Sequence, residues 1–111
     1  MDSVDYASRL RDVLRRRRAR ARARNLLLAH LTPAQRASLA EHGFFVVRGN
    51  CSGDEYEVHM RDGINVVRVR DRTRFCFSPR GALLPRPDVV LGQALILRHR
   101  EDWLLQKTGW R

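Results

Sequence analysis

Arginine supplies the side chains that could do chemistry in the first third of this chain. The segment RRRRARARAR, residues 15–24, follows Arg9 and Arg11, and Asp12 is the one acid among these nine arginines. Each guanidinium carries five N–H donors in a planar fork, which binds phosphate or carboxylate through paired hydrogen bonds. The candidate binding residues are Arg11, Arg15, Arg16, Arg17, Arg18, Arg20, Arg22 and Arg24.

A polyanion is the partner that this pattern favours. Arginines three or four residues apart are neighbours on a helix, and each such like-charge pair destabilises it by a few tenths of a kcal/mol. A phosphate backbone removes that repulsion and releases its own counterions. We therefore predict binding to nucleic acid, DNA or RNA, through its backbone without sequence specificity. The alternatives are an acidic protein surface and a merely solvated charged face. A membrane surface is disfavoured, because no continuous apolar face lies opposite the arginines.

A second basic face is predicted on a β-sheet. If Val67 and Val69 face the interior, the alternation of a strand turns four arginines outward. These are Arg68, Arg70, Arg72 and Arg74. Glu55 and Glu57 on the neighbouring strand could neutralise them as cross-strand pairs, which is the favoured interpretation. RNA-binding sheets expose aromatic side chains among such arginines, whereas most strand aromatics here are predicted to face inward.

Catalysis finds little support in the residues. The four histidines are scattered without metal-ligand spacing, and no phosphate-binding loop, nucleophile elbow or zinc-protease motif is present. We expect no catalytic residues, no metal site and no cofactor. The two cysteines, Cys51 and Cys76, form no CxxC motif, and we expect both to remain free thiols.

Length and composition indicate one small domain. The chain has 111 residues, a formal net charge of +10 and 43% hydrophobic residues, which can support a packed core. No apolar run approaches the roughly 18 residues of a membrane span. The polar, acidic start MDSVDYASRL is unlike a signal or transit peptide, so we expect a cytoplasmic location or the interior of a phage-like particle. Of the 22 basic residues only Lys107 is not arginine, and a GC-rich genome is an alternative cause of that bias.

The periodicity predicts an α+β fold. A long basic helix covers residues 3–31, and Thr32, Pro33 and Gln35 begin a short helix that Gly43 ends. Alternating segments then predict a four-stranded antiparallel meander, with a tight hairpin at Asp62-Gly63. The predicted strands cover residues 44–48, 55–61, 64–70 and 73–77. An irregular loop, residues 78–87, precedes a C-terminal helix that begins at Asp88, runs to about Lys107 and packs on the sheet.

These elements divide the chain into two parts. Residues 1–31 are predicted to be an arginine-rich helical extension, because residues 15–24 hold no side chain larger than alanine to bury. Residues 32–111 are predicted to be a small α+β domain, of which residues 32–107 fold without the arginine segment.

Four segments carry a resemblance. LTPAQR, GFFVV, CFSP and DVVLGQ, within roughly residues 26–105, are similar to motifs of short uncharacterised bacterial and bacteriophage-type proteins. Those proteins have LTPxQR, GxFxV, CxxP and DVxLxQ patterns. The resemblance implies a shared fold and no particular activity. Some members have histidine where this chain has Ser78, so a metal role for that turn lacks its ligand. The alternative function is a structural or assembly protein, such as a minor component of a phage-like particle, docked on an acidic protein surface.

Overall fold

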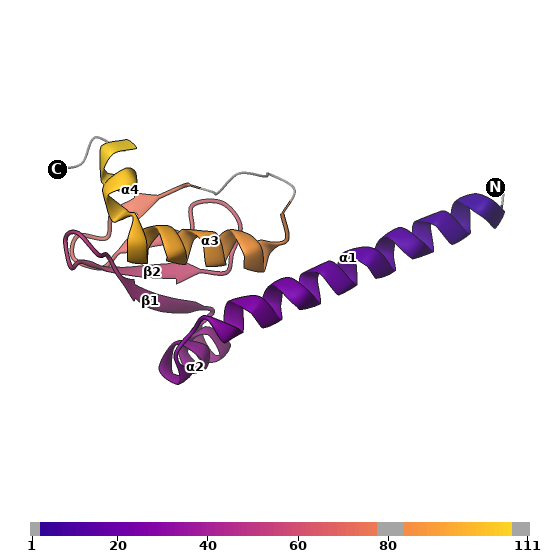
Figure 1. Cartoon of the computed structure of the whole chain (residues 1–111), viewed down its shortest axis with the longest axis horizontal. Helices are drawn as coiled ribbons and strands as arrows, with labels where there is room; N and C mark the ends of the chain where they lie inside the picture. The colour runs from indigo at the N-terminus through magenta and orange to yellow at the C-terminus, as the bar shows by residue number, and fades with distance from the viewer. Residues whose placement is uncertain (1–2, 78–83, 108–111) are drawn as a thin grey trace.

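The predicted α+β fold is confirmed in a computed structural model that describes residues 3–77 and 84–107 (Figure 1). Within these residues the helices are α1 (Ser3–Ala29), α2 (Pro33–His42), α3 (Arg86–His99) and α4 (Glu101–Lys107). The strands are β1 (Phe44–Arg48), β2 (Glu55–His59), β3 (Val66–Arg68) and β4 (Arg74–Phe75). They form an antiparallel sheet in the order β1-β2-β3-β4, which is the predicted meander.

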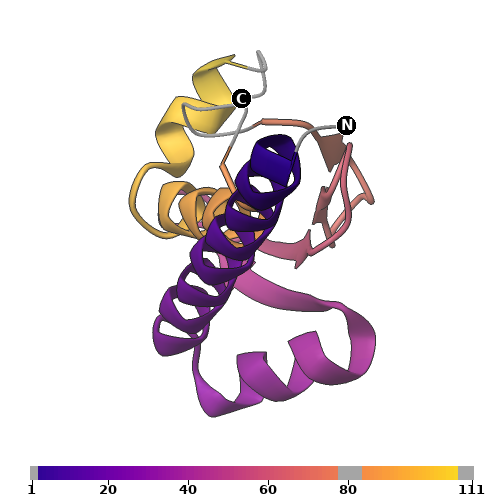
Figure 2. The ribbon, with the colours of Figure 1, turned by 90° about the vertical axis from the view of Figure 1, so that its right-hand side faces the viewer.

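One face of the sheet makes the core. Its apolar side chains come from all four strands, and α3 lies across them with α1 packed beside α3 (Figure 2). The side chains on this inner face are Phe45, Val47, Tyr56, Val58, Val66 and Phe75. From the helices, Leu27, Val90, Ala94 and Leu97 complete the core.

The long helix is only partly attached to the rest of the protein, residues 32–77 and 84–107, which we call the body. The side chains from Asp5 to Arg18 are all exposed, and α1 projects beyond the other elements (Figure 1). Contact with the body begins near Ala23, which is 4% exposed, and continues through Leu27 and Leu31, which are buried. Since α1 has 27 residues, at 1.5 Å per residue it is about 40 Å long. The predicted domain boundary after Leu31 stays a prediction. The last two turns of α1, which precede that boundary, already belong to the core.

Arginine side chains also hold the corner between α1 and α2. Arg36 donates to the carbonyls of Leu28 and Leu31, at 3.2 and 3.0 Å. Arg98 on α3 donates to the carbonyl of His30 at 3.1 Å and to Gln35 Oε1 at 3.0 Å. The last carbonyls of a helix lack partners within the helix, so these guanidinium groups satisfy the end of α1 and fix its direction.

The expected start and end of α2 are confirmed. Thr32 Oγ1 accepts from the Gln35 amide, the Gln35 side chain accepts from the Thr32 amide, and Gly43 ends the helix at φ +77. Side chains of α2 then bond the free edge of β1: Gln35 Nε2 donates to Val46 O and Ser38 Oγ to Phe44 O. The helix thereby covers an edge that could otherwise pair with another strand.

Three of the predicted strands are shorter in the structure, and the tight hairpin is wrong. Residues 60–65 connect β2 to β3, and Gly63 has φ +81 within that connection. The cause is Asn65, a buried residue whose amide donates to His59 O at 2.9 Å and to Gln93 Oε1 at 2.7 Å. Gln93 Nε2 returns a hydrogen bond to Asn65 Oδ1, so this pair pulls the chain inward before β3 begins.

The single C-terminal helix capped by Asp88 is also wrong. α3 begins at Arg86, which places Asp88 inside its first turn, and it ends at His99. Arg100 breaks the helix with φ −141 and ψ 42 before α4 starts at Glu101. Of the predicted 78–87 loop, residues 84 and 85 are non-helical, Arg86 and Pro87 are helical, and 78–83 lie outside the described residues.

A buried carboxylate explains the break between α3 and α4. Glu101 is 0% exposed and accepts four hydrogen bonds: from the Cys51 and Ser52 amides at 2.9 and 2.8 Å, from Ser52 Oγ at 2.5 Å and from the Tyr56 hydroxyl at 2.6 Å. Asn50 adds a hydrogen bond to His99 O and accepts from the Glu101 amide. The β1–β2 loop therefore binds Glu101 at the start of α4. If α3 continued past His99 without a break, the loop would lose these hydrogen bonds.

Hydrogen bonds decide the charge of this carboxylate. Burial alone would raise the pKa of Glu101, but the donors of Ser52, Tyr56 and Cys51 outweigh it and hold the pKa below its ordinary value. Burial and the hydrogen bond to Glu101 raise the pKa of Tyr56. Because the pKa of Glu101 is lowered by folding, its contribution is complete above the pKa of an unfolded glutamate, about 4.3. It is lost as pH falls further, through the lowered folded-state pKa.

The close approach of Gly49 to this carboxylate gives a first prediction. A Cβ at Gly49 would overlap the Glu101 carboxyl group, so Gly49→Ala should destabilise the protein. Glu101→Ala alone should cost about 2–4 kcal/mol, since it leaves buried donors without an acceptor. In the Glu101→Ala background, Gly49→Ala should be nearly neutral. Urea unfolding of the wild type, the two single variants and the double variant measures how far the effect of Gly49→Ala depends on Glu101. Asp102→Ala is the control, because Asp102 bonds Arg100 and should not relieve the overlap. Equal effects of Gly49→Ala in both backgrounds would contradict this arrangement.

A matched pair of leucines on α1 tests where the core begins. Leu27 is 0% exposed and Leu10 is 49% exposed. Leu27→Ala should reduce the free energy of unfolding by about 2–5 kcal/mol, as for other buried leucines. Leu10→Ala should change it by less than about 0.5 kcal/mol in the free protein. Chemical denaturation followed by circular dichroism compares the two, and a small loss for Leu27→Ala would place all of α1 outside the core.

Candidate nucleic-acid interface

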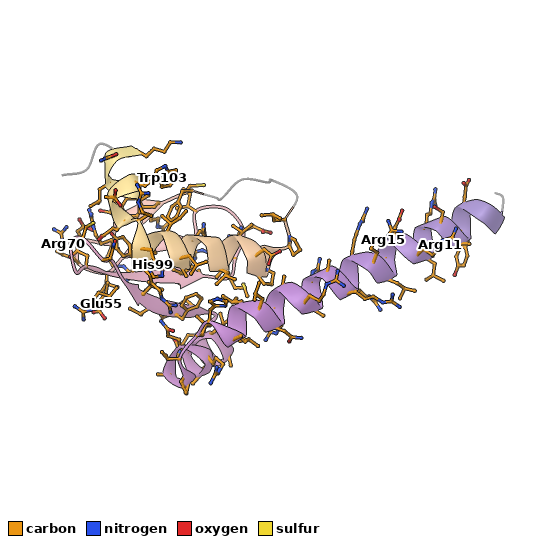
Figure 3. The ribbon with its side chains drawn as sticks, in the orientation of Figure 1. Arg11, Arg15, Glu55, Arg70, His99 and Trp103 are labelled. Carbon is orange, nitrogen blue, oxygen red and sulfur yellow. The ribbon has the colours of Figure 1, made fainter. Side chains whose placement is uncertain are left out.

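The predicted binding arginines all lie on α1, and all eight are exposed. Figure 3 shows Arg11 and Arg15 on the projecting part of the helix, at the opposite end of the molecule from Glu55 and Arg70. Helical spacing sets four of them along one side, where they border a shallow surface hollow of about 330 Å³ together with Leu14. These four are Arg11, Arg15, Arg18 and Arg22. Because they are three or four residues apart, their side chains form a ridge along the helix.

The arginines of α1 differ from those of the body in their partners. Among the described residues, every arginine ion pair is formed by the body: Arg68–Asp71, Arg70–Asp54, Arg72–Glu57, Arg86–Asp62 and Arg100–Asp102. No arginine of α1 forms one within this part of the chain. The body thus neutralises much of its own charge, whereas the helix presents its guanidinium groups to solvent.

The outward placement of Arg68 in the second basic face is wrong. Arg68 is 2% exposed and lies opposite Tyr56 in the sheet, two residues after the buried Val66. Val66 faces Val58 in the core, so Arg68 points to the same side. Val67 lies on the other face of the sheet and is buried there, at 3% exposed. The guanidinium donates twice to Asp71, at 3.1 and 2.8 Å, and lies 5.4 Å from the centre of the Phe75 ring.

This buried arginine is held charged by its surroundings. Hydrogen bonds to Asp71 raise the pKa of Arg68, and the same bonds, with those from Thr73, lower the pKa of Asp71. Arg72 has φ +59, and this turn brings Asp71 back toward Arg68. Arg68 is therefore a structural residue.

The other three arginines of that face lie outside the core. Arg70 forms an ion pair with Asp54 at 3.1 Å, and Arg72 with Glu57 at 3.1 Å. The expected neutralisation by Glu57 is confirmed for Arg72. Burial alone would raise the pKa of Glu57, but hydrogen bonds from Arg72 and His59 lower it. Arg74 is exposed and has no ion pair within the described residues.

The uncovered outer face of the sheet has a ring cluster that the sequence analysis did not place. Phe44 stacks on His42 with ring centres 5.7 Å apart and contacts His59 at 4.7 Å. The correct register between the first two predicted strands would have indicated this cluster, because Phe44 on β1 pairs with His59 on β2. His59 Nε2 lies 3.0 Å from Glu57 Oε1, so a carboxylate is part of the same cluster.

The remaining candidate chemistry is sparse. Residues 3–77 and 84–107 contain no group of three or more histidine, cysteine or acidic side chains that could hold a metal ion. No helix in that part of the chain combines the length and the apolar character that crossing a membrane requires. Cys51 and Cys76 are both free and exposed, as expected.

Comparison with protein families, curated proteins and solved structures finds no match to this chain. The resemblance carried by the LTPxQR, GxFxV, CxxP and DVxLxQ patterns stays a prediction. Function must therefore be argued from the geometry of the chain itself.

The contrast between Arg68 and Arg74 is testable. Arg68→Gln removes a buried, doubly bonded guanidinium and should lower the free energy of unfolding by about 1–3 kcal/mol. Arg74→Gln should change it by less than about 0.5 kcal/mol, because the side chain is exposed. Thermal and urea unfolding of both variants provide the comparison. Equal stability of the two variants would mean that Arg68 faces solvent after all.

Proposed function

We propose that this protein binds the phosphate backbone of nucleic acid through α1, without catalysis and without reading sequence. The observation that carries the proposal is the contrast in pairing: within the described residues the exposed arginines of α1 form no ion pair, and they stand on a segment that projects from the body. Residues 1–31 carry a net charge of +6, from nine basic and three acidic side chains.

The energetics support a polyanion as the missing partner. Like charges at positions such as Arg11 and Arg15, or Arg18 and Arg22, oppose the helix they stand on. A row of phosphates supplies the opposite charge at short intervals and gains free energy by releasing about 0.9 counterion per phosphate neutralised. The proposed location is the cytoplasm or the interior of a phage-like particle, where such a polyanion is present.

A competing proposal is supported by the apolar side chains at the exposed end of α1. Tyr6, Leu10, Val13 and Leu14 are 69, 49, 43 and 42% exposed. Docking on an acidic protein surface would bury them together with the arginines, as in an assembly protein. Such docking depends less on salt, because burial of apolar surface is not screened.

Five substitutions separate these proposals. Replacing Arg16, Arg18, Arg20, Arg22 and Arg24 by glutamine keeps helix propensity, since the two residues rank close together. Binding to unrelated nucleic-acid sequences should weaken alike, and the slope of log K against log salt concentration should shrink by up to about 4–5. Fluorescence anisotropy between roughly 50 and 200 mM salt measures both quantities.

The matched control removes the same charge from the body. The exposed arginines Arg48, Arg70, Arg72, Arg74 and Arg100 are replaced by glutamine, which gives an equal change in net charge. This control should keep most of the salt slope. An intact slope in the α1 variant would refute the proposal and favour docking on an acidic protein.

A further inference from the structure

Seven of the nine exposed arginines of α1 fall into two ridges that run along the helix. Each residue turns an α-helix by about 100°, because a turn has 3.6 residues. The first ridge is Arg11, Arg15, Arg18 and Arg22, which lie within a sector of about 60°. The second ridge is Arg9, Arg16 and Arg20, within about 40°. The centres of the two ridges are about 150° apart.

The two faces between the ridges differ in composition. The front face carries exposed side chains that are apolar or basic: Tyr6, Leu10, Val13, Leu14, Arg17, Ala21 and Arg24. The back face carries Asp5 and Asp12 and continues into Ala19 and Ala23. Both acids described on α1 therefore stand away from the front face.

The body of the protein leaves the front face open. Ala23, which is 4% exposed, points toward the body, and the hollow between α1 and the start of α3 is lined by Ala19, Ala23, Pro85 and Asp88, among others. At 100° per residue, the centre of the front face is about 145° from the direction of Ala23. Leu27, which is 0% exposed, points about 105° from that centre, toward the second ridge, so the body covers that side of α1 only at its last turns. The side chains from Asp5 to Arg18 are all exposed, so a long partner can lie against the front face along this projecting part of the helix.

Two opposed rows of guanidinium groups require two rows of anions. A single strand offers one line of phosphates and would engage one ridge, leaving the other in solvent. The major groove of B-form DNA is about 12 Å wide, has a phosphate strand on each side and admits an α-helix. The groove of an A-form RNA duplex is too deep and narrow for this.

We propose that α1 binds B-form duplex DNA by lying in the major groove, with the first ridge on one phosphate strand and the second ridge on the other. This inference rests on the proposed nucleic-acid function and names its substrate. The front face then meets the base edges, where its leucines and Ala21 can contact thymine methyl groups and Arg17 and Arg24 can reach guanine N7 and O6. The phosphate contacts of the two ridges supply the part of the affinity that is common to all sequences. The stretch from Arg9 to Arg24 is about 22 Å long, which is enough to occupy the groove for roughly half a turn or more of DNA.

The first test compares the ridges by matched variants. One protein carries Arg15→Gln, Arg18→Gln and Arg22→Gln, and the other carries Arg9→Gln, Arg16→Gln and Arg20→Gln. On a 20-base-pair DNA duplex, each variant should reduce the salt slope by up to about 2.7, because both ridges contact phosphates. Circular dichroism checks that α1 is still helical. A loss confined to one ridge would overturn the groove arrangement.

The second test locates the helix on the DNA. Saturating wild-type protein should protect guanine N7 from dimethyl sulfate, because N7 lies in the major groove, while adenine N3 in the minor groove stays reactive. Binding should also be weaker, at equal phosphate number, to single-stranded DNA and to an RNA duplex. Unprotected guanine N7, or equal affinity for a single strand, would refute the proposal.

These outcomes separate the inference from the function on which it rests. If one ridge matters and the other does not, backbone binding by α1 stands and the groove arrangement fails. If neither ridge variant changes binding to any of the three nucleic acids, both fail.

Discussion

The carboxylate of Glu101 is the interaction on which the body of this protein depends. It lies fully buried and is held by donors from the β1–β2 loop and from Tyr56 on β2. An ionised group inside a protein is tolerated only when hydrogen bonds replace its lost water. The need for those donors shapes the loop, requires glycine at position 49 and ends α3 at His99. The position of α3, in turn, sets the surface on which α1 rests.

Arginine has two separate roles in this molecule. Within the body, Arg36 and Arg98 satisfy the carbonyls at the end of α1, and Arg68 occupies the core with Asp71 as its partner. These side chains act as structural donors, and Arg68 is also neutralised by Asp71. On α1 the same residue type stands in solvent and forms no ion pair within the described residues. The biased composition therefore serves folding at one end of the molecule and leaves charge available at the other.

Local patterns predicted the features that depend on local forces. The capping box of Thr32 and Gln35, the stop at Gly43 and the ridge of Arg11, Arg15, Arg18 and Arg22 follow from neighbours along the chain. The predictions were wrong where the local structure depends on residues that are far apart in the sequence. In VVRVR either set of valines can face inward, and the pairing of Val66 with Val58 makes Arg68 the buried member. The break at Arg100 and the pairing of Asn65 with Gln93 likewise depend on partners far away in the sequence.

Neither margin of the sheet offers a long free edge to a new strand. On one side the side chains of Gln35 and Ser38 bond the outward carbonyls of β1, and on the other β4 extends only over Arg74–Phe75. A strand from another molecule would find few backbone groups to pair with. Crowding of many copies at high local concentration should therefore not convert into intermolecular β-structure. Copies of the protein can be packed densely and still remain separate folded molecules.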